Sequence, residues 1–142
     1  MRELQLTQGK IALIDAADFD RISAFKWCAS LDGRGATWYA IRRARKPERA
    51  RWRSQNIRLH HFVFDVTPLE LPPDHILEHE NQNSLDCRRS NLRVVHKSVN
   101  MLLAPGWKNR SVNSLSSCAE CGTPVLSTDF LCFKCDKTDP FA

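Results

Sequence analysis

The chain has 142 residues, a formal net charge of +5 and 42% hydrophobic residues, which suffices for one modest domain with a small appendage. No apolar run reaches the roughly 18 residues of a membrane-spanning helix, and the N-terminus lacks the basic-then-apolar pattern of a secretory signal. We therefore expect a cytoplasmic protein with no membrane partner.

Residues 1–66 predict mainly short strands. Segments 3–7 and 11–14 favour strands separated by Gly9, and Asp15 is placed to begin a short helix over residues 16–25. Segments 26–31 and 37–43 predict two strands joined by a turn at residues 32–35. The apolar segment 57–66 fits either a strand or a helix.

Residues 67–105 predict a strand–loop–strand–helix unit. The expected strands are 74–77 and 91–95, joined by a polar loop over residues 78–90, and apolar positions favour a helix over 97–103. Residues 106–117 form a Ser/Asn-rich linker, and residues 118–142 are organised around four cysteines. The fold class expected from these elements is α+β, with an N-terminal antiparallel β-hairpin region.

Basic side chains are concentrated between residues 42 and 58, where Glu48 is the only acidic residue. Such a cluster suits a polyanion, because each phosphate contact releases condensed counterions. We therefore expect residues 1–66 to contact DNA, and the alternative is a solvated basic hairpin. The expected phosphate-binding residues are Arg42, Arg43, Arg45, Lys46, Arg49, Arg51, Arg53 and Arg58.

The predicted strand–loop–strand–helix unit brings the end of its first strand against the start of its helix. Asp74 and Asn100 would then present oxygen atoms to one hard divalent cation, with His75 beside them. Mg²⁺ prefers oxygen ligands and keeps several waters, so two protein ligands suffice. A histidine, with an unperturbed pKa of about 6.5, suits a general base near neutral pH. This combination favours hydrolysis of a phosphodiester.

This stretch resembles the HNH homing endonucleases of phages and mobile introns, a branch of the ββα-metal nucleases. Their pattern is Asp-His, a short loop, Leu-Asp-Asn-Arg-x-x-Asn-Leu-Arg, and an Asn nine residues after the Asn of Asn-Leu-Arg. Residues 85–93 match except that Cys87 replaces an Asn, and Asn100 follows Asn91 by nine residues. The resemblance covers residues 4–104, and the loop between His75 and Asn91 is about four residues longer than usual.

The resemblance implies that His75 is the general base, that Asp74 and Asn100 bind one Mg²⁺ or Mn²⁺, and that Asn91 orients His75 or its loop. Arg93 either touches the scissile phosphate or pairs with a neighbouring carboxylate. The implied activity is cleavage of double-stranded DNA to 5′-phosphate and 3′-hydroxyl ends, as a nicking monomer or as a homodimer that cuts both strands.

Two other functions remain open: a non-catalytic, sequence-specific DNA-binding protein that keeps the HNH scaffold, and a restriction or defence nuclease. The expected location is the cytoplasm of a bacterial or phage-infected cell. The sequence assigns no role to the remaining histidines, although the longer loop carries His79 near the predicted site. They are His60, His61, His79 and His96.

The C-terminal segment predicts a zinc ribbon or knuckle. Two Cys-x-x-Cys pairs, Cys118 with Cys121 and Cys132 with Cys135, suit a closed tetrahedral site with one structural Zn²⁺ per chain. Two disulfides or free thiols are the alternative. Zinc would supply folding energy that so short a segment cannot obtain from an apolar core.

Overall fold

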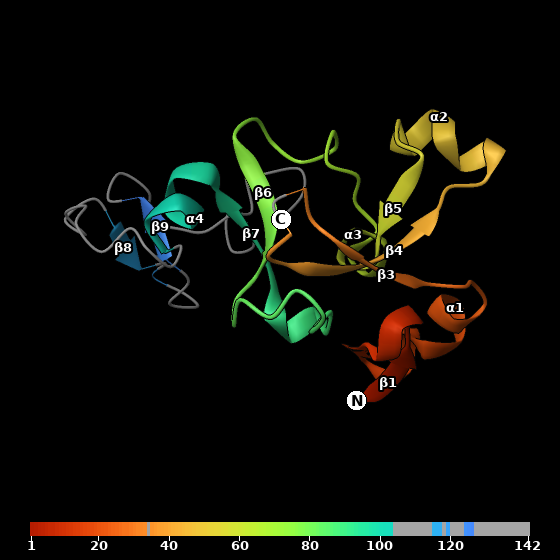
Figure 1. The fold of residues 1–142 in the computed structure, drawn as a ribbon. Helices are drawn as coiled ribbons and strands as arrows, with labels where there is room; N and C mark the ends of the chain where they lie inside the picture. Colours follow the sequence, from red (N-terminus) through yellow and green to blue (C-terminus); the bar gives the residue numbers. More distant parts are fainter. Residues whose placement is uncertain (34, 104–114, 118, 120–123, 127–142) are drawn as a thin grey trace. The chain divides into compact units, whose positions relative to one another are not determined.

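The computed structural model describes residues 1–33, 35–103, 115–117, 119 and 124–126 (Figure 1). It is an α+β structure with small antiparallel sheets and few, short helices, as the sequence predicts. The chain divides into two compact units. One contains Met1–Glu70 and His79–Leu92, and the other contains Leu71–Glu78 and Arg93–Ala142.

The first unit opens with two paired strands. β1 (Arg2–Gln5) runs antiparallel to β2 (Ile11–Ile14), with Leu4 opposite Ala12. Both of these side chains are buried. Because alternate residues of a strand face the same side, this register places one face of the pair in the core.

The helix expected over residues 16–25 is shorter than predicted. A 3-10 turn, η2 (Ala16–Asp18), leads into α1 (Phe19–Ser23), whose Ile22 is fully buried. Asp15 precedes the turn but makes no capping hydrogen bond. Its carboxylate instead accepts a hydrogen bond from the backbone N–H of Arg89 at 2.8 Å, so this side chain serves a contact distant in sequence.

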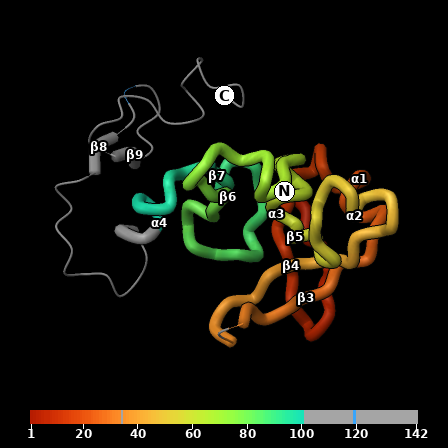
Figure 2. Tube along the Cα trace, turned by 90° about the horizontal axis from the view of Figure 1, so that it is seen from above, coloured from red at the N-terminus to blue at the C-terminus, as the bar shows by residue number. Residues whose placement is uncertain are grey.

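The predicted hairpin is confirmed. β3 (Cys28–Leu31) pairs antiparallel with β4 (Trp38–Arg43), and the two strands lie side by side in Figure 2. β5 (Asn56–Arg58) pairs with the other edge of β4, and α3 (Leu59–Phe64) follows it directly. The ambiguous segment 57–66 therefore holds the end of a strand and then a helix. Between β4 and β5 lie η3 (Lys46–Glu48) and α2 (Arg49–Trp52).

The polar loop that follows residue 79 is attached to β2. The N–H of Leu13 donates to the carbonyl of Leu85 and the N–H of Cys87 donates to the carbonyl of Leu13, each at 2.8 Å. Leu13 and Asp86 form an isolated parallel bridge there. The guanidinium of Arg89 also pairs with the buried carboxylate of Asp18 at 2.8 Å. The N-terminal segment thus holds this loop in place.

The predicted strand–loop–strand–helix order is present. β6 (His75–His79) and β7 (Leu92–His96) form a two-stranded sheet, η4 (Arg89–Asn91) precedes β7, and α4 (Lys97–Leu103) begins and ends where the sequence predicts. β6 continues to His79, two residues beyond the predicted end. Within this extension the carboxylate of Glu78 pairs with Arg93 of β7.

In the C-terminal segment, β8 (Leu115–Ser117) pairs antiparallel with β9 (Pro124–Leu126). The four cysteines of the predicted zinc site, Cys118, Cys121, Cys132 and Cys135, lie outside the described residues. Within the described part of the chain, no helix is long and apolar enough to cross a membrane.

Candidate functional site

Strand β6 has an acidic residue followed by a histidine at each end. Asp74 and His75 mark its start, and Glu78 and His79 mark its end. The sequence predicts the catalytic site at the first pair. The surroundings of the two pairs differ in exposure, in charge and in the contacts that restrict each side chain.

Asp74 lies in an open environment just before β6. Its side chain is 70% exposed and its carboxylate lies 3.7 Å from the Lys97 ammonium, which is itself 60% exposed. Its φ of +59° is in the left-handed region, which is uncommon for a residue with a side chain. Its carbonyl accepts the N–H of Lys97 at 2.7 Å, so the backbone before β6 is bonded to the first residue of α4.

His75 is half-buried, and its Nδ1 lies 2.9 Å from the carbonyl oxygen of Pro73. A carbonyl oxygen only accepts, so Nδ1 carries the proton in the neutral ring and Nε2 keeps a lone pair. The ring also meets that of His96 edge-on, with centroids 5.3 Å apart. His75 therefore has a tautomer compatible with proton acceptance, next to an exposed carboxylate.

Glu78 makes a close ion pair. Its Oε1 accepts a hydrogen bond from Nε of Arg93 at 2.7 Å, and the two side chains are only 11% and 15% exposed. The structure therefore has Arg93 paired with a neighbouring carboxylate, which is one of the two roles that the sequence left open. The carboxylate of Glu78 already holds a positive charge in a largely enclosed setting.

His79 belongs to a cluster of three histidines in the first unit. Its ring centroid lies 4.7 Å from that of His60, and the rings of His60 and His61 are 4.6 Å apart. The Nε2 of His79 lies 3.8 Å from the buried thiol of Cys87. Burial lowers the pKa of His79 to about 4, and it also lowers the pKa values of His60 and His61. All three rings are therefore neutral at pH 7.

The Cys87 thiol contributes to this environment. Burial raises its pKa well above the ordinary value, so the sulfur keeps its proton. The thiol hydrogen has an acceptor in the carbonyl of Ser84 at 3.7 Å, so the sulfur can accept from the Nε2–H of His79 and leave the ring's lone pair on Nδ1. The sequence analysis noted Cys87 only as a replacement of an Asn, and the structure adds its contact with His79.

Asn91 ties down the loop that follows His79. Its Oδ1 accepts the N–H of Asn81 at 3.0 Å, and its Nδ2 donates to Oδ1 of Asn81 at 2.9 Å and to the carbonyl of Asp86 at 2.8 Å. The carbonyl of Asn91 accepts the N–H of Glu80 at 2.8 Å. These bonds hold the residues directly after His79. Of the two roles that the resemblance allowed for Asn91, positioning a loop is the one these contacts describe.

Asn100 lies on α4 and is half-buried, in the same unit as Asp74 and Glu78. Among the described residues, no group of three or more His, Cys, Asp or Glu side chains is arranged to hold a metal ion. A hard cation that keeps most of its waters needs fewer protein ligands than that.

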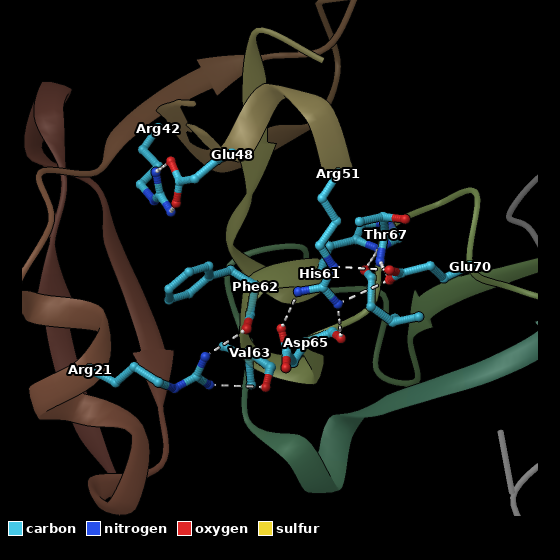
Figure 3. Close-up of polar contacts among 11 residues, drawn as sticks. Arg21, Arg42, Glu48, Arg51, His61, Phe62, Val63, Asp65, Thr67 and Glu70 are labelled. Carbon is cyan, nitrogen blue, oxygen red and sulfur yellow. Dashed lines mark hydrogen bonds and ion pairs between the residues drawn. The ribbon is translucent and has the colours of Figure 1, made fainter. Parts of the chain in front are cut away.

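Two arginines of the basic stretch, Arg42 and Arg51, pair with acidic side chains (Figure 3). Arg42 is an exception to the prediction of phosphate contacts, because its side chain is only 3% exposed and bonds to both carboxylate oxygens of Glu48. Its guanidinium also lies 4.0 Å from the ring centroid of Phe25. Arg51 pairs with Asp65 at 3.0 Å and with Glu70 at 2.9 Å. Arg51 is exposed, as are the six other basic residues of the stretch: Arg43, Arg45, Lys46, Arg49, Arg53 and Arg58.

Arg42 is thus buried in the first unit, where its charge is paired with Glu48, and this burial argues against the phosphate contact that the sequence predicts for it. The ion pair with Arg42 also lowers the pKa of Glu48 to about 2. Glu48, the single acidic residue of this stretch, therefore neutralises a buried charge, and the exposed basic residues have no other acidic residue within the stretch.

Comparisons of the chain with protein-family models, with curated protein sequences and with solved structures gave no match. The function is therefore inferred from the chain's own residues and their geometry.

The sequence pattern gave no role to Glu78 and His79 as a pair, although a signal was present. The loop after His75 is about four residues longer than the HNH pattern, and His79 follows His75 by four residues. If the loop is counted from His79 and not from His75, its length no longer exceeds that of the HNH pattern. The sequence pattern selects Asp74-His75 because this pair has the Asp-His of the pattern, whereas Glu78 is a conservative change from Asp.

Proposed function

We propose that this chain is a metal-dependent endonuclease of the HNH type that hydrolyses phosphodiester bonds in double-stranded DNA. The observation that carries the proposal is the buried Asn91, whose side chain ties the loop between β6 and β7 directly after His79. The helix after β7 supplies Asn100, nine residues beyond Asn91. Strand, tethered loop, strand and helix occur in the order that the resemblance implies.

Within this proposal, Glu78 and His79 replace Asp74 and His75 as the acidic residue and the general base. The bonds of Asn91 hold the segment after His79, and the loop from His79 to Asn91 has the family's usual length. Glu78 and His79 are consecutive residues of β6, so the chain itself sets their proximity. Asp74 and His75 remain the alternative pair, and mutation separates the two.

The proposed task of His79 is to take a proton from the attacking water. The ring is neutral at pH 7, because burial lowers its pKa to about 4, so it has a nitrogen lone pair to offer. A DNA phosphate beside it would raise this pKa toward the working pH, because a negative charge favours the imidazolium. Contacts with His60 and Cys87 restrict the rotation of the ring.

Glu78 and Asn100 are the proposed ligands of one Mg²⁺ or Mn²⁺. The oxygen donors of a carboxylate and an amide suit a hard cation, and the carboxylate of Glu78 already binds a cationic side chain at 2.7 Å. When bound, the metal would neutralise charge on the phosphate and on the leaving 3′ oxygen. The products expected from the resemblance are 5′-phosphate and 3′-hydroxyl ends.

The six exposed basic residues other than Arg51 between positions 43 and 58 are proposed to bind DNA phosphates. Replacing Arg45, Arg49 and Arg53 with Ala should reduce the slope of log affinity against log salt by about 0.9 for each phosphate that is no longer neutralised. Arg51→Ala is the matched control, because its guanidinium is paired with Asp65 and Glu70 and should contribute less to the slope. An unchanged slope in the triple variant would exclude this surface.

For the C-terminal segment we propose one structural zinc bound by Cys118, Cys121, Cys132 and Cys135. The antiparallel pair β8–β9 supports this, because the first Cys-x-x-Cys pair lies in the chain segment that joins the two strands. Elemental analysis of protein purified without chelators should find about one zinc per chain, since thiolates select zinc. Less than about half an equivalent would exclude the site.

The activity is tested by incubating the full chain with supercoiled plasmid, with and without Mg²⁺. Open-circular product would indicate a monomer that nicks, and linear product a homodimer that cuts both strands. Brief EDTA treatment should stop cleavage and added Mg²⁺ should restore it, because an open oxygen-ligand site exchanges its metal rapidly. Binding of DNA without cleavage under all these conditions would favour the non-catalytic DNA-binding alternative. A restriction or defence nuclease would differ in biological role and not in chemistry.

A further inference from the structure

The Glu78–Arg93 ion pair occupies a carboxylate that the proposed metal would need. Nε of Arg93 donates to Oε1 of Glu78 at 2.7 Å, and both side chains are largely enclosed. An ion pair in such a setting has lost much of its hydration, so removing one partner is costly unless another charge replaces it. A divalent cation at Glu78 would compete with the guanidinium for this carboxylate and would release its Nε donor to bind another acceptor.

We infer that Arg93 and the divalent cation compete for the carboxylate of Glu78, and that metal binding redirects the Arg93 guanidinium to a DNA phosphate. The inference rests on the proposed function, because it takes Glu78 as a metal ligand and DNA as the substrate. Without metal, Arg93 screens the carboxylate from the polyanion. With metal, the same side chain adds a positive charge to the DNA-binding surface.

Two properties of arginine support this exchange. A guanidinium stays positively charged throughout the working pH range, so it cannot lower its energy by losing a proton when it leaves Glu78. Its planar set of donors also matches phosphate oxygens as well as it matches a carboxylate. A phosphate is therefore a suitable second partner, and DNA and metal should each strengthen the binding of the other.

The pair at the other end of β6 provides a control. Lys97 and Asp74 are 3.7 Å apart and 60% and 70% exposed, so water already solvates both charges. Lys97 should compete only weakly with a metal cation for the carboxylate of Asp74, because exposed ion pairs contribute little. Arg93→Met and Lys97→Met remove the same charge and leave an apolar stem of comparable length.

The first measurement is Mn²⁺ binding to the full chain without DNA at pH 8. The electron paramagnetic resonance signal of unbound Mn²⁺ monitors the binding. Arg93→Met should tighten binding by at least about tenfold, because a hydrogen bond between charged groups is worth at least that factor. Lys97→Met should leave the affinity nearly unchanged. Circular dichroism verifies that both variants are folded. If Arg93→Met does not fold, Arg93→Gln takes its place.

The second measurement is binding of a short DNA duplex with and without Ca²⁺ at a concentration that gives no cleavage. Ca²⁺ should strengthen DNA binding by the wild-type chain and have a smaller effect on Arg93→Met, since the coupling between two ligands is reciprocal. Equal Mn²⁺ affinity in wild type and Arg93→Met would overturn the competition while leaving the metal site intact. No saturable Mn²⁺ binding in either protein would overturn both the competition and the proposed metal site. Tighter binding in Lys97→Met alone would move the metal to Asp74 and overturn the inference.

Discussion

The two ends of β6 carry similar residues in different environments. At its start, Asp74 is 70% exposed, adopts a left-handed backbone conformation and lies near an exposed lysine. At its end, Glu78 is 11% exposed and paired with Arg93, and His79 has a desolvated ring followed by a loop that Asn91 holds. An acid-histidine dipeptide therefore does not define a site by itself. The surroundings that restrict its geometry identify the candidate, and those surroundings favour the end of the strand.

A large effect is expected from removing the acidic residue at the end of β6 and a small one from removing that at its start. Glu78→Ala should reduce metal-dependent cleavage by more than about 100-fold, because it removes one of the two proposed protein ligands of the metal. Asp74→Ala should retain most of the activity. The measurement is the initial rate of plasmid nicking across a range of Mg²⁺ concentrations. Loss of activity in Asp74→Ala together with normal activity in Glu78→Ala would reverse the assignment.

Acid should destabilise the fold through the histidines at the His79 end. The folded-state pKa of His79, about 4, lies below the ordinary histidine value of 6.5, so the unfolded chain binds more protons between these pH values. This contribution is complete above about pH 6.5 and decreases as the pH falls toward 4, by roughly 3 kcal/mol from His79 alone. The pKa values of His60 and His61, also lowered by burial, act in the same direction.

Urea unfolding at intervals from pH 7.5 to 4.5 would measure this decrease in stability. His79→Gln is the matched variant and should show a shallower dependence on pH. Glu48 and Glu70, whose pKa values are lowered to about 2, contribute to acid sensitivity mainly below this window. A flat profile in the wild-type chain would show that the rings are not desolvated.

Asn91→Ala removes the side chain that holds the loop, so the N–H of Asn81 and the carbonyl of Asp86 lose this partner. The change should lower the free energy of unfolding by about 2 kcal/mol. It should also reduce cleavage. Asn83→Ala is the control, because Asn83 lies on the same loop but is exposed and accepts a hydrogen bond from Leu85. Comparison of the two variants by urea unfolding separates the tether from a general sensitivity of the loop. Equal effects would mean that Asn91 has no special role.

The smallest expected effect is at Asp74. Asp74→Gly should stabilise the protein by about 0.5–1 kcal/mol, because glycine adopts the left-handed conformation without the steric cost of a Cβ. It also removes a carboxylate that the alternative assignment would use to bind metal. A thermal unfolding curve and a nicking assay on this one variant should show a slightly higher midpoint and near-normal cleavage. Loss of cleavage in a stable Asp74→Gly protein would favour the alternative.

Much of the fold could be predicted from the sequence. The hairpin around residues 32–35, the strand–loop–strand order and the bounds of α4 follow from local apolar periodicity and turn residues, which need no distant partner. The role of Asp15 could not be predicted, because its carboxylate bonds to Arg89 and a cap is only the local option. The burial of Arg42 depends on Glu48 and Phe25, so composition alone placed it on the surface.

The candidate site was predicted in part for the same reason. Asn91 and Asn100 enter the candidate site because of their fixed spacing along the chain, and their roles stay predictions. The choice of histidine also stays open in the sequence, because two acid-histidine dipeptides lie within six residues and periodicity does not rank them. The contacts of His79 with His60 and Cys87 and the bonds of Asn91 join residues that are distant in sequence or lie across a turn. Only the folded chain displays them.

The most direct test compares His79→Ala with His75→Ala in nicking of supercoiled plasmid with Mg²⁺, at equal occupancy of DNA. Our account predicts a loss of about 10²–10⁴-fold in His79→Ala, as expected when a general base is removed, with DNA binding retained. His75→Ala should cleave at close to the wild-type rate. The opposite result, an inactive His75→Ala beside an active His79→Ala, would contradict the assignment of the catalytic site to the end of β6.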